Sequence, residues 1–437
     1  MICINAIKKP LRLTLLVLLA TCMTRLLFAQ DRLRLNLDEK GKTYIKASLR
    51  GQFWARFTEM NPGTHIKSDT VQNGLDFSIR RIRLNIAAQL SPRVFVYVLM
   101  GHNNLNQKNT SGFPMHMLDY YVEYKVSDGL ELGLGESAWG GTSRWNVRST
   151  FSYMALDAPL FSLSTVNRTD DLGRTPGIWA KGQMGKFDYV LAMKKPLRYG
   201  LEAREGITDF AQGSENYRYS AYLKYELLDN ESNKTPFSGG TGTYLGTKRI
   251  LNLGGGVMHQ KNMCAALVDG NEQFYNFRSW TLEAFYDTPI DPVRGTALTT
   301  YLGYFYTDFG PNYIRNLGAN GYTEGGSTFN GAGNAFPMMG TGSTVFFQLG
   351  YLMKQLNGAR NSPQLQPNLA IQYSVFDRLN EPMVTYDLGV NLYLKGHFNK
   401  LTLGLQNRPV YQELVDGALN VTERKNMLVL QYQIVIH

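Results

Sequence analysis

The chain has 437 residues, a formal net charge of +10 and a mean hydropathy of −0.25. It contains no apolar run near the roughly 20 residues of a membrane-spanning helix, which excludes a helical membrane protein. It also has no lysine-rich tail or basic helix, which argues against nucleic-acid binding. The 26 Tyr, 22 Phe, 5 Trp and 43 Gly suit an aromatic-belted β-barrel, although the length would also allow a large soluble core.

The first 29 residues are predicted to be a secretory signal peptide. A basic start precedes a short apolar run, Leu11–Ala20, and a small residue, Ala29, follows it. Cleavage after Ala29 leaves Gln30 at the mature terminus. Removing the leader's four basic residues lowers the formal charge from +10 to +6.

The three cysteines leave little room for cysteine chemistry. Cys3 and Cys22 lie in the leader, so Cys264 is alone in the mature chain and can form neither an internal disulfide nor a thiolate metal site. Lipidation at Cys22 is the alternative to simple cleavage. Thr21 disfavours it, because Thr is bulkier than the Gly, Ala or Ser usual before a lipidated Cys.

Strict alternation of apolar and polar residues begins at 43–57. Ile45, Leu49 and Phe53 alternate with polar residues such as Lys46 and Arg50. A period of two over this length predicts a β-strand with one apolar and one hydrated face. A wall with lipid on one side and water on the other fits this pattern. A long hairpin strand of a soluble protein is the alternative.

The pattern recurs to the C-terminus and predicts about 16 strands. Their ranges in chain order are 43–57, 75–90, 94–100, 119–125, 129–135, 175–182, 187–195, 217–226, 249–259, 273–286, 297–308, 345–353, 369–376, 383–394, 400–406 and 427–436. Within 75–90 the apolar residues change parity, and a β-bulge at Arg80 and Arg81 would restore a single outer face. We therefore predict an all-β fold, a transmembrane antiparallel β-barrel over 30–437, with a soluble β-sandwich or propeller as the alternative.

The connections between these strands support the barrel. With a periplasmic N-terminus, the early periplasmic turns are short and the external loops long, as in outer-membrane barrels. The external segment 137–173 lacks a period of two and is rich in aromatic residues, so we expect it to fold inward as loop 3 and constrict the lumen. The connection 229–247 is too long for a short turn, so either it contains a strand or one periplasmic turn is long.

A 16-strand barrel cannot fill its lumen with the side chains of its own wall. Basic residues are predicted to line that lumen, where guanidinium groups bind phosphate and carboxylate through paired hydrogen bonds. The candidate pore-lining, anion-binding residues are Lys46, Arg50, Arg56, Arg81, Arg83, Arg144, Arg148, Arg168, Lys181, Arg218 and Lys224. The alternative is that they brace the barrel through ion pairs with Asp and Glu.

Several strands resemble the phosphate-selective porin O and P family of outer-membrane porins in Bacteroidota-like Gram-negative bacteria. The resemblance is carried by F-S-I-R-R-I-R-L at 77–84, V-F-V-Y-V-L-M-G at 94–101, L-D-Y-Y-V-E-Y at 118–124 and L-E-L-G-L-G-E at 130–136. It implies a sixteen-strand, trimeric barrel that passes small anions. The family's pore arginines would correspond to Arg81 and Arg83.

The sequence therefore predicts a porin for passive diffusion of small solutes, with a preference for phosphate or other small anions. No H-E-x-x-H, G-x-S-x-G or P-loop is present, so we expect no enzyme activity, cofactor or metal. A non-conducting scaffold, a secretion or adhesion component, and a channel for hydrophobic or sugar solutes are the alternatives. Expected partners are outer-membrane lipid, lipopolysaccharide, small anions and two further copies in a homotrimer, in the outer membrane of a Gram-negative bacterium.

Overall fold

The computed structural model of the chain describes residues 33–108, 114–147, 149–197, 200, 203–212, 215–234, 242–321, 324–358, 362–415 and 417–436. The predicted leader, its cleavage after Ala29 and the Cys22 alternative lie outside the described residues. No helix in the described part of the chain is both long and apolar enough to cross a bilayer.

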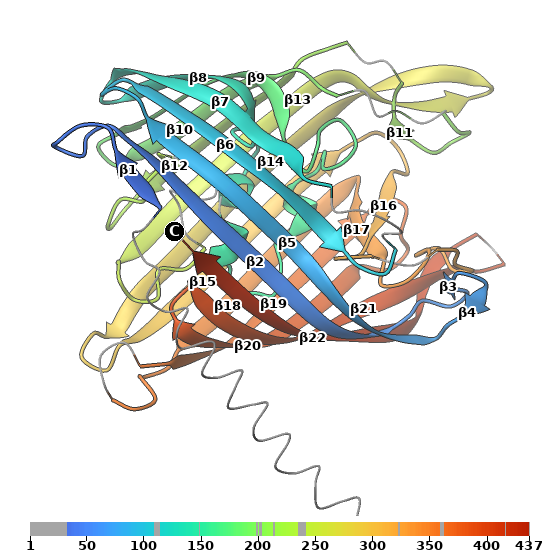
Figure 1. Cartoon of the computed structure of the whole chain (residues 1–437). Coiled ribbons are helices and arrows are strands. Elements are labelled where there is room, and N and C mark those ends of the chain that lie inside the picture. The colour runs from blue at the N-terminus through green and yellow to red at the C-terminus, as the bar shows by residue number, and fades with distance from the viewer. Residues whose placement is uncertain are drawn as a thin grey trace, which may run out of the picture.

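Sixteen antiparallel strands close into a tilted barrel (Figure 1). One sheet holds 18 strands; the short β1 (Arg34–Asn36) and β11 (Asp209–Phe210) are additions to it, and the other sixteen form the ring. These are β2 (Tyr44–Glu59), β5 (Asn73–Gln89), β6 (Val94–Leu105), β7 (His116–Ser127), β8 (Leu130–Ser137), β9 (Thr175–Met184), β10 (Phe187–Lys194), β12 (Arg218–Glu226), β13 (Ile250–Val268), β14 (Asn271–Asp291), β15 (Thr296–Asp308), β18 (Gly342–Leu352), β19 (Gln364–Phe376), β20 (Met383–Lys395), β21 (Asn399–Glu413) and β22 (Leu419–Ile436).

The last strand closes the ring against the first. β22 pairs antiparallel with β2, from Leu49 opposite Ile436 to Thr58 opposite Met427. Across this seam the Gln52 side chain donates a hydrogen bond to Gln433, 2.9 Å away. Every strand of the ring therefore has two neighbours, and no backbone edge is left for lipid to solvate.

The predicted fold class and all sixteen predicted strands are confirmed. The largest difference is the hairpin of β13 and β14, which extends beyond the predicted ranges 249–259 and 273–286. The pairing of these strands shifts register between Gln260 and Cys264. That irregularity interrupts the alternation, so the pattern that marks the strand in the sequence ends early.

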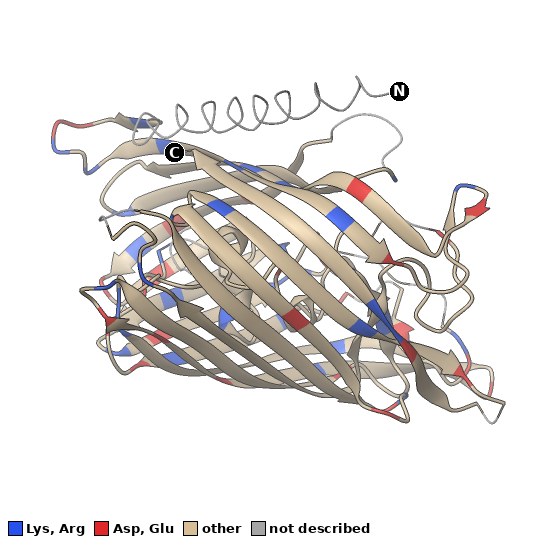
Figure 2. Cartoon of the chain, turned by 90° about the horizontal axis from the view of Figure 1, so that it is seen from below, with Lys and Arg blue, Asp and Glu red and all other residues tan. Residues whose placement is uncertain are grey.

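The alternation in β2 separates an inner from an outer face. Gln52 and Arg56 are 1% and 0% exposed, whereas Phe53 and Phe57 are 40% and 45% exposed. Apolar side chains of the other strands are exposed in the same way, including Leu75 and Phe77. Charged residues are sparse along the strands and more frequent in the turns and loops at the two ends (Figure 2). This outer surface suits contact with lipid.

The β-bulge predicted in β5 is confirmed. Gln52 lies opposite Arg81 and Phe53 lies opposite Ile79, which leaves Arg80 as the extra residue. A bulge lets two successive side chains leave the strand on the same side. Arg80 and Arg81 are accordingly both buried on the inner face, each 3% exposed.

Smaller elements lie at the two ends of the barrel (Figure 1). β1 lies near the C-terminal end of the chain, while two small hairpins lie at the opposite end. The hairpins are β3 (His65–Ile66) with β4 (Asp69–Thr70), and β16 (Ile314–Leu317) with β17 (Phe336–Gly340). Between β8 and β9 the segment 138–174 contains three short 3₁₀ helices, η2 (Arg144–Val147), η3 (Thr150–Ser152) and η4 (Leu160–Ser162).

The connection between β12 and β13 is a long turn. Its described residues, 227–234 and 242–249, contain no strand. Glu231 in this connection is 1% exposed and accepts hydrogen bonds from Arg144, Lys224 and Asn252. Lys224 and Asn252 belong to the barrel wall, so the long turn folds back against inward side chains. Of the two possibilities left open by the sequence, the long turn is the one observed among these residues.

Candidate functional site

The segment 138–174 contacts inward side chains of strands far apart in the ring. On one side, Arg50 of β2 lies 3.5 Å from the hydroxyl of Ser149. On another, side chains of β20, β21 and β22 donate to its backbone carbonyls at 2.7–2.9 Å: Asn391 to Met154, Lys400 to Tyr153 and Gln433 to Phe151. These bonds satisfy carbonyl groups that would otherwise be buried without a partner.

Aromatic contacts hold the same segment against β15 and β18. The Trp145 ring centroid lies 4.8 Å from that of Tyr301, and Phe161 lies 5.0 Å from Phe305. Phe346 of β18 meets both Trp145 and Phe161 edge-on. Edge-to-face aromatic pairs stabilise beyond their buried area, so this side of the lumen is a packed apolar cluster.

An arginine-lined chamber of about 410 Å³ lies between the segment 138–174, the strands β5 and β6, and residues 315–320 of the β15–β18 connection. We call it the arginine chamber. None of the described residues that line it is Asp or Glu. Its seven arginines are Arg50, Arg80, Arg81, Arg83, Arg168, Arg174 and Arg315.

Two carboxylates behind the lining neutralise part of this charge. Asp157 forms ion pairs with both Arg80, at 2.7 Å, and Arg81. Burial raises the pKa of Asp157, but the two guanidinium groups outweigh it and bring that pKa down to about 2. Asp119 accepts a hydrogen bond from Arg174 at 3.0 Å.

Three arginines of the chamber form no ion pair with a carboxylate among the described residues: Arg83, Arg168 and Arg315. Arg83 donates to the carbonyls of Ile82 and His102, at 2.7 and 2.8 Å, and to Asn103. Arg315 is 5% exposed and its Nη2 lies 2.9 Å from the sulfur of Met339. Its Nε and Nη1 are buried without a hydrogen-bond partner in the part of the chain that the structure describes. The chamber therefore keeps excess positive charge.

The rest of the chamber lining has more apolar than polar side chains. The polar ones are Asn103, Asn104, Asn146, Ser149, Thr150, Asn167, Asn316 and Asn320. Tyr97 and Leu99 of β6 lie on the wall side. The segment 138–174 supplies the larger share, namely Trp145, Phe151, Tyr153, Leu160, Leu163, Val166 and Leu172. A solute in this chamber would therefore meet guanidinium groups and hydrocarbon together.

Nine of the eleven predicted site residues fall into two sets in the structure. Arg50, Arg81, Arg83 and Arg168 line the arginine chamber. Five others form ion pairs away from it: Arg56 with Asp76, Arg144 with Glu231, Lys181 with Glu123 and Glu131, Arg218 with Asp170, and Lys224 with Asp188, Glu226 and Glu231. Lys46 is half-buried on β2. Arg148 lies outside the described residues.

Sequence reasoning missed three arginines of the chamber. The sequence predicts that Arg80 lies in a bulge but not that it faces inward; the available signal is that a bulge turns two successive residues to the same side. Arg174 is the last residue before β9, and Arg315 lies in the Gly/Asn-rich connection between β15 and β18. Neither residue lies in a segment where apolar and polar residues alternate, so the neighbouring sequence does not indicate which way its side chain points.

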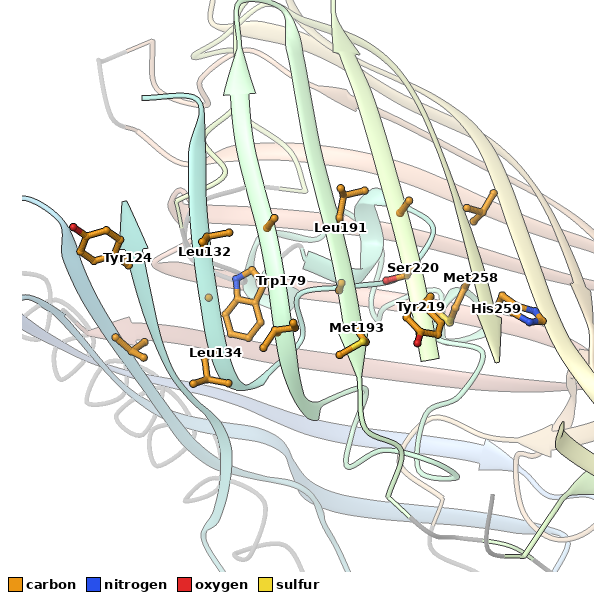
Figure 3. Close-up of a pocket in the computed structure, with 17 residues that line it drawn as sticks. Tyr124, Leu132, Leu134, Trp179, Leu191, Met193, Tyr219, Ser220, Met258 and His259 are labelled. Carbon is orange, nitrogen blue, oxygen red and sulfur yellow. The ribbon is translucent and has the colours of Figure 1, made fainter. Parts of the chain in front are cut away.

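The outer face carries a hollow of its own, shown in Figure 3. It crosses β7–β10, β12 and β13, has a volume of about 750 Å³ and is lined by outward side chains such as Leu132, Leu134, Leu191 and Tyr219. Small residues on the outer face, including Ala180 and Ala221, leave the depression. It is apolar and lies on the surface suited to lipid, separate from the arginine chamber. Among the described residues, no group of three or more His, Cys, Asp or Glu side chains could hold a metal ion.

A closed ring of sixteen antiparallel strands, polar inside and apolar outside, is the fold of outer-membrane porins. Several solved outer-membrane channels are similar to this chain. OprB of Pseudomonas putida has a TM-score of 0.53 and 11% sequence identity over 90% of this chain and 94% of that chain. An anion-selective porin from Comamonas acidovorans has a TM-score of 0.46 and 14% sequence identity over 90% of this chain and 99% of that chain. The outer-membrane channel DcaP of Acinetobacter baumannii has a TM-score of 0.47 and 10% sequence identity over 91% of this chain and 99% of that chain. No protein-family model and no curated protein matches the sequence.

Proposed function

We propose that the protein is an outer-membrane porin that lets small solutes diffuse passively, with a preference for anions. The observation that carries the proposal is the arginine chamber, in which Arg83, Arg168 and Arg315 have no carboxylate partner among the described residues. A narrow passage with low-dielectric walls and fixed positive charge concentrates anions and repels cations. The fold supports the channel, since a ring this wide is not filled by its own wall.

The segment 138–174 is the proposed constriction of this channel. Its hydrogen bonds to β20, β21 and β22 and its aromatic contacts with β15 and β18 support that role. Together they fix the segment opposite the arginines of β5, so that a solute would pass between them. The β12–β13 turn, which reaches Arg144 through Glu231, would narrow the same passage from the other end.

The remaining parts of the proposal follow from the sequence. The 29-residue leader would direct the chain to the outer membrane, where lipid and lipopolysaccharide would contact the apolar belt. Resemblance to the porin O and P family supports a homotrimer and phosphate among the permeant anions. We propose a channel rather than an enzyme.

The reversal potential across a planar bilayer tests the anion preference. The purified mature protein is inserted and a KCl gradient is applied. We expect macroscopic conductance and a potential whose sign shows that chloride crosses more readily than potassium. A potential of the opposite sign would overturn the anion preference, and an intact barrel without conductance would favour a scaffold. Chemical cross-linking in the same detergent tests the trimer.

A further inference from the structure

The arginine chamber is lined by both guanidinium groups and apolar side chains, and no single inorganic anion uses both. We propose that it selects amphipathic organic anions, in which a carboxylate is held by arginines and an aromatic or short aliphatic body lies against the segment 138–174. This inference rests on the proposed function and deepens it by naming the solute class. Inorganic phosphate would then be a weaker ligand.

The arginines of the chamber outnumber the carboxylates that pair with them among the described residues. Arg315 is buried, and its Nε and Nη1 have no hydrogen-bond partner among the described residues. These two nitrogens have almost no accessible surface, so Arg315 contributes positive charge to the chamber rather than hydrogen bonds from them. A carboxylate fits best, since guanidinium and carboxylate form two parallel hydrogen bonds. Arg83 and Arg168, which form no ion pair among these residues, add further positive charge to the chamber.

The apolar side is too extensive for a hydrated ion. Phe151, Leu160, Leu163, Val166 and Leu172 all line the chamber. A phosphate ion would leave these side chains against water and would gain nothing from them. A hydrocarbon body would displace that water, and the burial of apolar surface favours binding in proportion to the area covered.

The size of the chamber supports the same solute class. Its volume of about 410 Å³ falls within the roughly 300–1,000 Å³ of sites for small organic molecules. Such sites combine an apolar lining with a few placed polar groups. Arg315 belongs to β16, whereas most of the apolar lining belongs to the segment between β8 and β9, which also supplies Arg168 and Arg174.

Block of KCl conductance by four probes tests the solute class in bilayers holding the mature protein. The probes are 3-phenylpropionate, acetate, inorganic phosphate and uncharged 3-phenylpropanol. We expect 3-phenylpropionate to half-block the current at a concentration about tenfold lower than acetate or phosphate. 3-Phenylpropanol should have little effect, because it lacks the charge that the arginines recognise. Equal or stronger block by phosphate would overturn the proposal.

Two variants separate the two halves of the chamber. Arg315→Gln should weaken block by 3-phenylpropionate about tenfold. Leu172→Asn should weaken it without changing block by acetate or phosphate. Leu172 has φ +53°, a conformation that Asn adopts readily, so the variant should fold.

Each variant has a matched control. Leu245→Asn makes the same exchange at φ +51° in the β12–β13 turn, away from the chamber. Arg378→Gln removes a half-exposed arginine outside the lining, between β19 and β20. Neither control should alter block by 3-phenylpropionate. If Leu172→Asn behaves like Leu245→Asn, the apolar half of the proposal is wrong.

Calorimetric titration of the detergent-solubilised protein distinguishes failure of this inference from failure of the proposed channel. Binding of 3-phenylpropionate by a protein without conductance would contradict the channel and support the ligand class. Anion-selective conductance with no preference for 3-phenylpropionate over phosphate, by block and by titration, would leave the porin standing and overturn the inference.

Discussion

Basic residues lie in two regions of the lumen and are neutralised to very different extents. Around Glu231, the cations Arg144, Lys181 and Lys224 each contact at least one carboxylate, and Lys224 contacts three within 3.1 Å. In the arginine chamber, by contrast, seven arginines line a cavity with no described acidic residue on its wall. We therefore expect the number of inward cations by itself to say little about the channel's selectivity. We expect a cation with a carboxylate partner to brace the barrel and one without such a partner to attract a solute.

The largest loss of stability is expected around Glu231, where the basic residues are most completely paired with carboxylates. Glu231→Ala leaves Arg144 without the carboxylate it meets at 3.1 Å and removes one partner of Lys224. Loss of one member of a buried ion pair costs about 3–5 kcal/mol. We expect the free energy of unfolding, measured in urea on protein refolded into vesicles, to fall by about 3 kcal/mol. A loss no larger than that of an exposed pair would mean that the cluster does not brace the barrel.

Removing charge from the chamber should change selectivity more than stability. Arg83→Gln takes away a guanidinium that has no carboxylate partner among the described residues. We expect the chloride-to-potassium permeability ratio, measured from the reversal potential, to fall about twofold. Arg81→Ala should act in the same direction. Arg249→Gln, at an exposed position beside β13, is the control and should leave the ratio unchanged; an equal shift there would show a general surface effect.

Asp157 allows the opposite change within the same chamber. Asp157→Asn frees Arg80 and Arg81 from their shared carboxylate, so the permeability ratio should rise, by about twofold or less. Asp157 has a pKa of about 2, so it stays charged until the pH falls to that value. From about pH 8 to 4 its charge should therefore add no pH dependence to selectivity. A rise in the wild-type ratio between pH 6 and 4 that disappears in Asp157→Asn would contradict this assignment.

The smallest loss of stability should come from breaking an ion pair at the surface. Glu215 and Lys195 lie 3.0 Å apart, and their side chains are 61% and 41% exposed. Water and salt screen such a pair, so Glu215→Ala should lower the free energy of unfolding by less than about 1 kcal/mol. The same urea titration provides the scale for Glu231→Ala. A loss similar to that of Glu231→Ala would remove the distinction between buried and exposed pairs.

The barrel could be predicted from the sequence because its wall obeys a local rule. The alternation of apolar and polar residues in β2, and its change of parity at Arg80, can be recognised from neighbouring residues alone. The chamber could be predicted only in part. The inward positions of Arg81 and Arg83 follow from the strand pattern. The side-chain direction of Arg315 depends on the fold of a connection in which apolar and polar residues do not alternate. The pairing of Arg144 depends on Glu231, 87 residues away in the sequence.

The pairing of β2 with β22 means that the barrel wall closes only when the last strand is present. Gln52 and Gln433 meet across it although 381 residues separate them in the chain. A polypeptide that stopped before Leu419 would expose the hydrogen-bonding groups of both β2 and β21 as free sheet edges. Such edges recruit other strands or, in hydrocarbon, remain unsolvated at high cost. Loss of the last strand should therefore yield aggregates rather than a smaller pore.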